Sequence, residues 1–353
     1  MFSLLDKRFT DILVQPARKR NEYSAFCSMV DSADIPEHSK VIFFGDRGYT
    51  SYNNFAHVIE KGQYFLIRCN DKRASGMMGY PVDTLPAFDE DISLILTRSK
   101  AVSKYSRPEL FSSYRYIYQN APMDYLNDQR TEYDLTLRLL RVQLDDGSYE
   151  NIATNLPEEE FKAEDFKALY HLRWQEENSF RDLKYSLCLK AFHSKKYDYI
   201  VQEVWARVIL YNFSSSIIIN VTVDREDRAY EYQANYSSAL KTCRDFLRIH
   251  DGITKINVES LIAQNIEPIR PGRTFARQHR FKLSDEFLLY DISINSYITI
   301  FHLRQISMLN IDFVFLLYLN FSKTLYLDPS ISHFYHNQIL LLIFSSMQYW
   351  QIA

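Results

Sequence analysis

The stretch YHLRWQEENSFRDLK, residues 170–184, predicts a helix around which the rest of the chain is organised. At about 100° per residue, its side chains separate into an apolar face that can pack on a sheet or another helix and a polar face. The apolar face consists of Leu169, Leu172, Phe180, Leu183 and Leu187. The polar face consists of Tyr170, Arg173, Glu177, Arg181 and Lys184. The helix therefore combines a docking face with one carboxylate, one phenol and three cations.

The polar face has two interpretations. It is a solvated surface in which Glu177 forms ion pairs with Arg173 and Arg181 at helical contact spacing, or it is part of a binding site. A solvated helix usually scatters charges of both signs, whereas here three cations surround one carboxylate. The stretch alone leaves both interpretations open.

Composition limits the classes of function. The chain has 353 residues, which suggests about two domains, and a formal net charge of −3. Because the whole chain is not basic, any contact with nucleic acid must come from local basic patches. Its four cysteines are far apart and include no Cys-x-x-Cys, so neither a zinc site nor a disulfide framework is indicated. Charged residues within the first ten argue against a secretory signal, and we expect a cytoplasmic protein.

The composition changes after about Asp291. Charged side chains become rare in residues 292–353, where they are Arg304, Asp312, Lys323 and Asp328. The apolar runs at 313–319 and 339–344 are much shorter than the roughly 20 residues of a membrane span, so a membrane anchor is disfavoured. We expect an atypical tail appended to a finished domain, and a displaced or readthrough reading frame would also explain it.

A second feature lies near the start of the chain. Residues 40–44, KVIFF, predict a buried strand that ends in Gly45-Asp46-Arg47-Gly48-Tyr49. An acidic residue between two glycines at the end of a buried strand is a common position for a metal-binding or catalytic carboxylate, although an ordinary turn explains it equally well. A predicted helix at 53–61 and a predicted strand at 64–68 follow, and this order of elements indicates an α/β sheet.

The next region predicts short β segments. We expect strands at 92–97 and 114–118, and a hairpin of 135–144 with 149–155. Pro157 and the acidic run after it then open a helical region. Further on, residues 200–221 predict a long apolar helix, and 270–282 combine five Lys or Arg with two Phe. This basic arm either contacts phosphates or is a basic surface loop.

The spacing Tyr170-x2-Arg173-x3-Glu177-x6-Lys184 resembles the C-terminal signature of bacterial DDE transposases of the insertion-sequence-four family. The segment around Asp46 is similar to the family's segment around its second catalytic Asp. The resemblance covers roughly residues 4–290. It divides the chain into the first part of a catalytic domain at 1–74, a β-rich insertion at 75–156, a helical part with the basic arm at 157–290, and the tail at 291–353.

The resemblance implies an α/β fold, an RNase H-like catalytic domain with an all-β insertion. It implies that Asp46 and Glu177 are catalytic and hold Mg²⁺ or Mn²⁺ for phosphodiester cleavage and strand transfer. It also implies double-stranded DNA as the partner, both transposon ends and target, with a homodimer in the DNA complex and a bacterial, nucleoid-associated location. The implied DNA-binding residues are Tyr170, Arg173, Arg181 and Lys184.

The chain departs from the family at its first carboxylate. The family's first Asp sits on the central strand, and the matching position falls before Met1, which leaves Asp11 as the strand-borne substitute. We therefore expect an N-terminally truncated transposase, defective in catalysis, with an unfilled gap in its sheet. Two alternatives remain: a non-catalytic DNA-binding remnant, and an unrelated metal-dependent nuclease.

Overall fold

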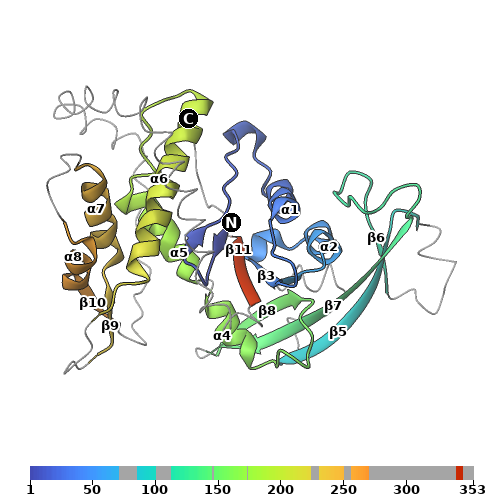
Figure 1. Ribbon diagram of the computed structural model, residues 1–353. Helices are drawn as coiled ribbons and strands as arrows, with labels where there is room; N and C mark the ends of the chain where they lie inside the picture. Colours follow the sequence, from blue (N-terminus) through green and yellow to red (C-terminus); the bar gives the residue numbers. More distant parts are fainter. Residues whose placement is uncertain are drawn as a thin grey trace. The chain divides into compact units, whose positions relative to one another are not determined.

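The computed structural model describes residues 1–70, 86–100, 113–144, 147–172, 174–223, 230–249, 256–269 and 339–344 (Figure 1). All of them belong to one compact unit. This unit is built on a mixed sheet whose described strands number nine, with helices on its faces. The α/β class expected from the sequence is confirmed.

The strands follow the order β2-β1-β11-β3-β4-β8-β7-β5-β6 across the sheet. The pairs β11–β3, β3–β4 and β5–β6 are parallel, and the other neighbours are antiparallel. The bounds are β1 Phe2–Ser3, β2 Arg8–Phe9, β3 Lys40–Gly45, β4 Tyr64–Cys69, β5 Phe88–Thr97, β6 Tyr114–Tyr116, β7 Glu132–Gln143, β8 Tyr149–Thr154 and β11 Ile339–Phe344. A separate two-stranded sheet pairs β9 Tyr232–Ala234 with β10 Ile266–Pro268.

Three of the described helices begin at an asparagine whose side chain satisfies one of their first amide groups. Asn21, Asn235 and Asn257 each accept a hydrogen bond from the backbone N–H three residues later, at the starts of α1, α7 and α8. The α-helices are α1 Glu22–Ser32, α2 Tyr52–Glu60, α4 Asp165–Leu172, α5 Trp174–Arg181, α6 Tyr197–Ile218, α7 Tyr236–Leu247 and α8 Val258–Gln264. Short turns form η1 Ala17–Lys19 and η2 Arg47–Tyr49, and η5 Asp182–Ser186 is a π-helix.

Two hydrophobic cores lie on opposite sides of the sheet, because successive strand residues point to opposite faces. Val41 and Phe43 of β3 join Phe26 of α1 and Phe55 of α2 in one core. Their neighbours on β3, Ile42 and Phe44, join the core that contains residues of α4, η5, α6 and α7. Since both faces are covered, β3 is apolar throughout its centre, as parallel strands in such sheets usually are.

The structure confirms most predicted elements near the start of the chain. The predicted strands at 40–44 and 64–68 and the helix at 53–61 are β3, β4 and α2. The predicted hairpin is the antiparallel pair β7–β8. These strands, together with β5 and β6, extend the same sheet through the β4–β8 pairing.

The predicted helix at 170–184 is correct in its apolar face and wrong at its end. Leu183 and Leu187 are buried, and Leu169, Leu172 and Phe180 pack against the same core. From Asp182, however, the helix widens into the π-helix η5, in which the N–H of Leu187 donates to the carbonyl of Asp182, five residues earlier. The α-helical hydrogen-bond pattern therefore ends at Arg181, although Leu183 and Leu187 beyond it still lie in the predicted core.

The expected gap in the sheet does not exist. The position between β1 and β3 is filled by β11, from the tail that we expected to lie outside the finished domain (Figure 1). All six residues of β3 pair with β11, and both residues of β1 pair with it on the other side. The physical reason is that buried N–H and C=O groups of β3 need partners, and an extended aliphatic segment supplies them. The basic arm at 270–282 lies outside the described residues.

Candidate functional site

Asp46 lies directly after β3, where the chain turns sharply. A side chain at Gly45 would place its Cβ 3.0 Å from Cγ1 of Ile67 and 3.3 Å from Cβ of Tyr49, so only glycine fits without a shift of its neighbours. Asp46 begins the turn η2, and its Oδ1 accepts a hydrogen bond from the N–H of Gly48 at 2.7 Å. The predicted candidate is thus a carboxylate fixed by its own turn at the end of a buried strand.

Tyr49 links Asp46 to helix α5. Burial raises the pKa of Tyr49 well above its usual value, and the negative charges of Asp46, Glu22 and Glu176 raise it further. Asp46 and Glu176 therefore both act electrostatically on one buried phenol. The fold brings the end of β3 and the first part of α5 into the same neighbourhood.

Two adjacent glutamates of α5 have different environments. Glu176 is 1% exposed, whereas the predicted site residue Glu177 is partly exposed. Glu176 also lies near the buried amino group of Met1, whose pKa is lowered by burial and raised by Glu176 and Asp11. Burying a carboxylate is costly unless other groups compensate, so Glu176 is a candidate site residue that the polar face of the helix did not predict.

The sequence carried a signal for Glu176. With Tyr170 at zero and 100° per residue, position 176 falls at about 240°, in the middle of the apolar face. A carboxylate in an apolar face is the informative exception to helix patterning. Position 177 falls at about −20°, on the polar face, which agrees with its partial exposure.

Asp182 is another buried carboxylate that the sequence pattern did not single out. Burial raises its pKa, and hydrogen bonds from Ser237 and Ser186 oppose that shift. The hydroxyl groups of these two serines also lie 2.9 Å apart. Asp182 therefore joins the π-helix to α7, which makes it a structural group at the edge of the predicted basic face.

The predicted DNA-binding residues are described only in part. Arg181 is exposed and Lys184 is partly buried, while Arg173 and the side chain of Tyr170 lie outside the described residues. Burial lowers the pKa of Lys184, and the positive charge of Lys190 lowers it further. Lys190, which the sequence pattern did not single out, therefore lies close enough to Lys184 to add to a local positive potential.

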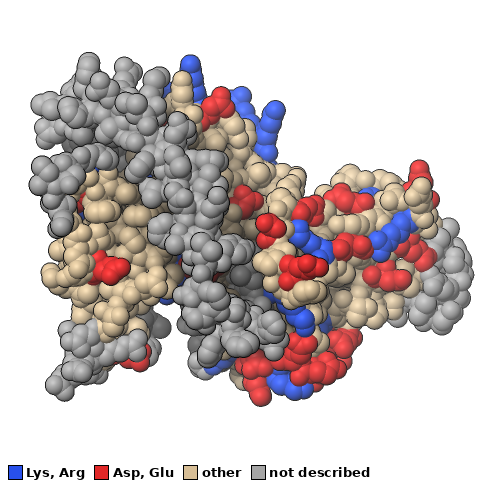
Figure 2. Space-filling view, viewed as in Figure 1, with Lys and Arg blue, Asp and Glu red and all other residues tan. Residues whose placement is uncertain are grey.

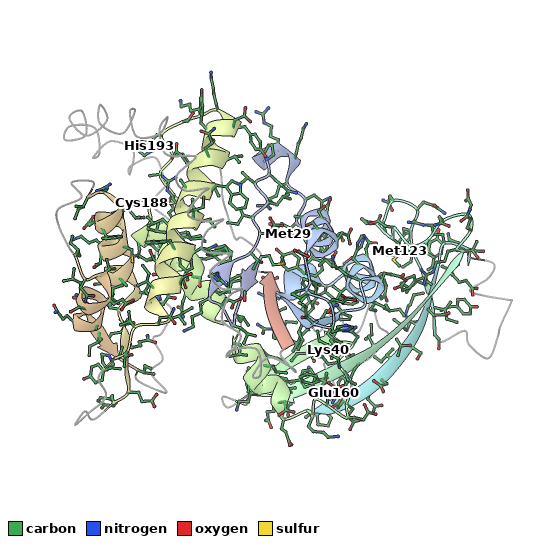
Figure 3. The ribbon with its side chains drawn as sticks, in the orientation of Figure 1. Met29, Lys40, Met123, Glu160, Cys188 and His193 are labelled. Carbon is green, nitrogen blue, oxygen red and sulfur yellow. The ribbon has the colours of Figure 1, made fainter. Side chains whose placement is uncertain are left out.

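A network at the start of α6 shapes the preceding loop. The carboxylate of Glu203 accepts hydrogen bonds from the backbone N–H groups of His193 and Ser194 and forms an ion pair with Arg207 at 3.1 Å. Figure 3 shows His193 and Cys188 beside α6.

We call residues 181–196 the basic segment. In Figure 2, Lys and Arg project at the upper edge, over η1 and the start of α6, and acidic side chains gather below, around α4.

The described residues do not make a three-carboxylate metal site. No group of three or more His, Cys, Asp or Glu side chains among them is placed to hold a metal ion. Asp11, the expected substitute for the first carboxylate, lies two residues beyond the end of β2 and not on a strand. β11 occupies the central position of the sheet and contains no acidic residue. A two-metal set as in other phosphodiester-cleaving enzymes therefore does not fit the described donors.

Comparison with known proteins identifies the family of the chain. The family model of the transposase DDE domain matches residues 1–213, which is more than half of the sequence. A search of curated proteins found no match. Within the described residues, no helix is both long and apolar enough to cross a membrane. The matched region includes β3, the turn at Asp46, and helices α4 and α5. The chain therefore belongs to the transposase DDE domain family.

Proposed function

We propose that this chain is a transposase of the insertion-sequence-four type that binds double-stranded DNA through its basic segment and is defective in cleavage as it stands. The family match supports transposition as its process. The observation that carries the defect is the central strand β11, which brings no carboxylate to the strand position beside Asp46. The proposed catalytic pair is Asp46 and Glu177, with Mg²⁺ or Mn²⁺ as the ion.

The basic segment has the features of a phosphate-binding surface. Its exposed cations are Arg181, Lys190, Lys195 and Lys196, beside the partly buried Lys184. Crowding of Lys184 by Lys190 disfavours the charged form, and a phosphate placed between them would remove this repulsion. The loop that holds these lysines is fixed by Glu203, so less conformational freedom is lost on binding. By the resemblance, Tyr170 and Arg173 belong to the same surface.

The test of DNA binding measures affinity for fragments that flank the gene, against random fragments of equal length, over a range of salt. We expect Lys190→Ala or Arg181→Ala to weaken binding and to reduce the salt slope by about 1 for each phosphate that is no longer neutralised. Lys162→Ala is the matched control, because this lysine is exposed in the acidic region before α4. Equal losses in all three variants would contradict a localised DNA surface.

The test of the defect incubates the same fragments with the purified chain and Mg²⁺ or Mn²⁺. We expect binding without nicking. Nicking that Asp46→Asn or Glu177→Gln abolishes would show that the site is complete and would overturn the defect. Cleavage of random and flanking fragments at equal rates would instead favour an unrelated metal-dependent nuclease.

Binding without cleavage would leave the non-catalytic, DNA-binding interpretation. We further propose that the chain acts as a homodimer on DNA, at the nucleoid of a bacterial cytoplasm. The mass of the DNA complex in solution tests the dimer, because complexes with one chain and with two chains on the same DNA differ by 41.9 kDa.

A further inference from the structure

A turn before helix α1 presents three consecutive cations. Arg18 and Lys19 lie in η1 and Arg20 follows it, and all three side chains are exposed. Arg20 forms an ion pair with Glu22 at 3.6 Å. Within the described part of the chain, Arg18 and Lys19 form no ion pair. Because like charges at neighbouring positions repel one another, these cations do not stabilise the turn that carries them.

The two ends of this turn are tied together by side-chain hydrogen bonds. Nε2 of Gln15 donates to the carbonyl of Asn21 at 3.2 Å, and Oε1 of Gln15 accepts from the N–H of Asn21 at 2.8 Å. Inside the turn, the N–H of Lys19 donates to the carbonyl of Pro16 at 2.8 Å. The ring of Pro16 also fixes its own φ angle. The cations therefore stand on a preorganised turn, so a ligand that binds them needs to order little backbone.

The turn is joined to the start of helix α6. The hydroxyl of Tyr197, the first residue of α6, donates to the carbonyl of Val14 at 2.7 Å. Arg18 follows Val14 by four residues, so their Cα atoms lie within about 14 Å of one another. Lys195 and Lys196, which are exposed, directly precede Tyr197. Two groups of cations that are far apart in the sequence therefore lie within one turn of a DNA duplex, about 34 Å.

The two groups form one positively charged surface. We call it the basic ridge, and it consists of Arg18, Lys19, Arg20, Lys195 and Lys196. Glu22 and Asp198 are the acidic residues of the stretches 14–22 and 193–199 that carry the ridge, so five cations stand against two carboxylates. Figure 2 shows Lys and Arg projecting over η1 and the start of α6. The surface therefore favours a ligand with several negative charges.

The ridge is suited to phosphates rather than to base edges. Readout of bases in the major groove usually needs an α-helix or a two-stranded ribbon that enters the groove. η1 is a single turn of three residues, and its cations stand on the outside of the molecule. Contacts to phosphates hold and position DNA but carry no sequence information, and their strength depends on salt.

We propose that the basic ridge is a further phosphate-binding surface, which holds double-stranded DNA without regard to its sequence and extends the DNA interface from the basic segment to the turn before α1. Lys195 and Lys196 belong to both surfaces, so one duplex can contact the two together. The ridge as a DNA site rests on the proposed function, in which double-stranded DNA is the partner.

The experiment measures the affinity of the full chain for the flanking fragments and for random fragments of equal length, over a range of salt. The double variant Arg18→Ala with Lys19→Ala should weaken binding to both kinds of DNA by about tenfold at 0.1 M salt. It should also reduce the salt slope by about 2, because two phosphates are no longer neutralised. The charge-conserving variant Arg18→Lys with Lys19→Arg and the control Lys162→Ala should stay within about twofold of the unaltered chain.

Three outcomes would overturn the ridge. They are an unchanged salt slope in the Arg18→Ala with Lys19→Ala variant, a loss confined to the flanking fragments, and an equal loss in the charge-conserving variant. The midpoint of urea unfolding should be the same in every variant, because the substituted side chains are exposed. Lys195→Ala with Lys196→Ala repeats the measurement at the other end of the ridge, where the same reduction in slope is expected.

The same assay separates the ridge from the proposed function. If Arg181→Ala and Lys190→Ala weaken binding while Arg18→Ala with Lys19→Ala does not, the ridge is refuted and the basic segment stands. If the unaltered chain binds neither kind of DNA, the proposed function itself is refuted, and the ridge is refuted with it.

Discussion

The two neighbours of β3 make an instructive comparison. β4 and β11 both run parallel to it, both have six residues, and both are predominantly apolar. β4 follows β3 through α2 within 20 residues, whereas β11 begins almost 300 residues later. The comparison shows that the same short apolar pattern occurs in a strand close to β3 in sequence and in one far from it. Because closing a long loop costs more entropy, β4 can pair early in folding and β11 must join later.

The largest expected effects come from proline substitutions in the two strands. Leu66→Pro in β4 and Leu341→Pro in β11 each remove a hydrogen-bond donor from a strand that has neighbours on both sides, which leaves a backbone carbonyl without its partner at a cost of at least about 1–3 kcal/mol. The free energy of unfolding, measured in urea, checks this. Leu66→Ile and Leu341→Ile are the volume-conserving controls. A harmless Leu341→Pro beside a disruptive Leu66→Pro would break the comparison, because it would remove β11 from the sheet.

A smaller effect is expected at the contact between Gly45 of β3 and Ile67 of β4. Gly45→Ala places a methyl group 3.0 Å from Cγ1 of Ile67, and overpacking of this kind costs about 1–3 kcal/mol. Ile67→Ala removes the opposing carbon, so the double variant should lose less stability than the sum of the two single variants. Unfolding of all three variants in urea measures the coupling. Additive losses would show that the contact does not limit position 45.

His57 in helix α2, which connects β3 to β4, should make the free energy of unfolding depend on pH. Nδ1 of His57 lies 2.8 Å from Asp31 and Nε2 lies 2.9 Å from Asp124. A hydrogen bond with Cys27, and those with the two carboxylates, raise the pKa of His57 from 6.5 to about 10, against the effect of burial. A raised folded-state pKa stabilises the fold fully below the unfolded value, and this contribution is lost as the pH rises through about 10.

Solvent screens part of this interaction, because both carboxylates are exposed. We therefore expect His57→Gln to cost about 1–2 kcal/mol at pH 6 and less at pH 10. Urea unfolding at the two pH values measures this loss in the free energy of unfolding. A loss that does not change with pH would show that His57 acts through packing alone.

The smallest effect concerns the start of β3, where Lys40 pairs with β11 and the pairing with β4 begins two residues later. Lys40 and Glu160 point toward one another with an Nζ to Oε1 distance of 3.3 Å, and about half of each side chain is exposed (Figure 3). Lys40→Gln should change the free energy of unfolding by less than about 0.5 kcal/mol and by less still at high salt. A loss comparable to that of Gly45→Ala would mean that this end of the sheet is less exposed to solvent than its geometry indicates.

Much of the fold follows from local patterns. The apolar run at 40–44, the turn at Asp46 and the apolar face of residues 169–187 each have one physical solution, and the structure contains them. The π-helix at Asp182 could not be predicted from an α-helical period, since a wider turn changes which residues share a face. Glu176 was visible as a carboxylate in an apolar face. That it and Asp46 both act on the buried Tyr49 was not visible, because the two carboxylates are 130 positions apart.

The sequence by itself determined the elements on either side of β3 and the family to which the chain belongs, because hydrophobic period, capping residues and motif spacing act over a few turns of chain. The tertiary structure decided which strand lies in the middle of the sheet. Backbone hydrogen bonds carry no sequence label, so any extended apolar segment that can reach β1 and β3 satisfies them, and only the assembled fold shows that Ile339–Phe344 does so.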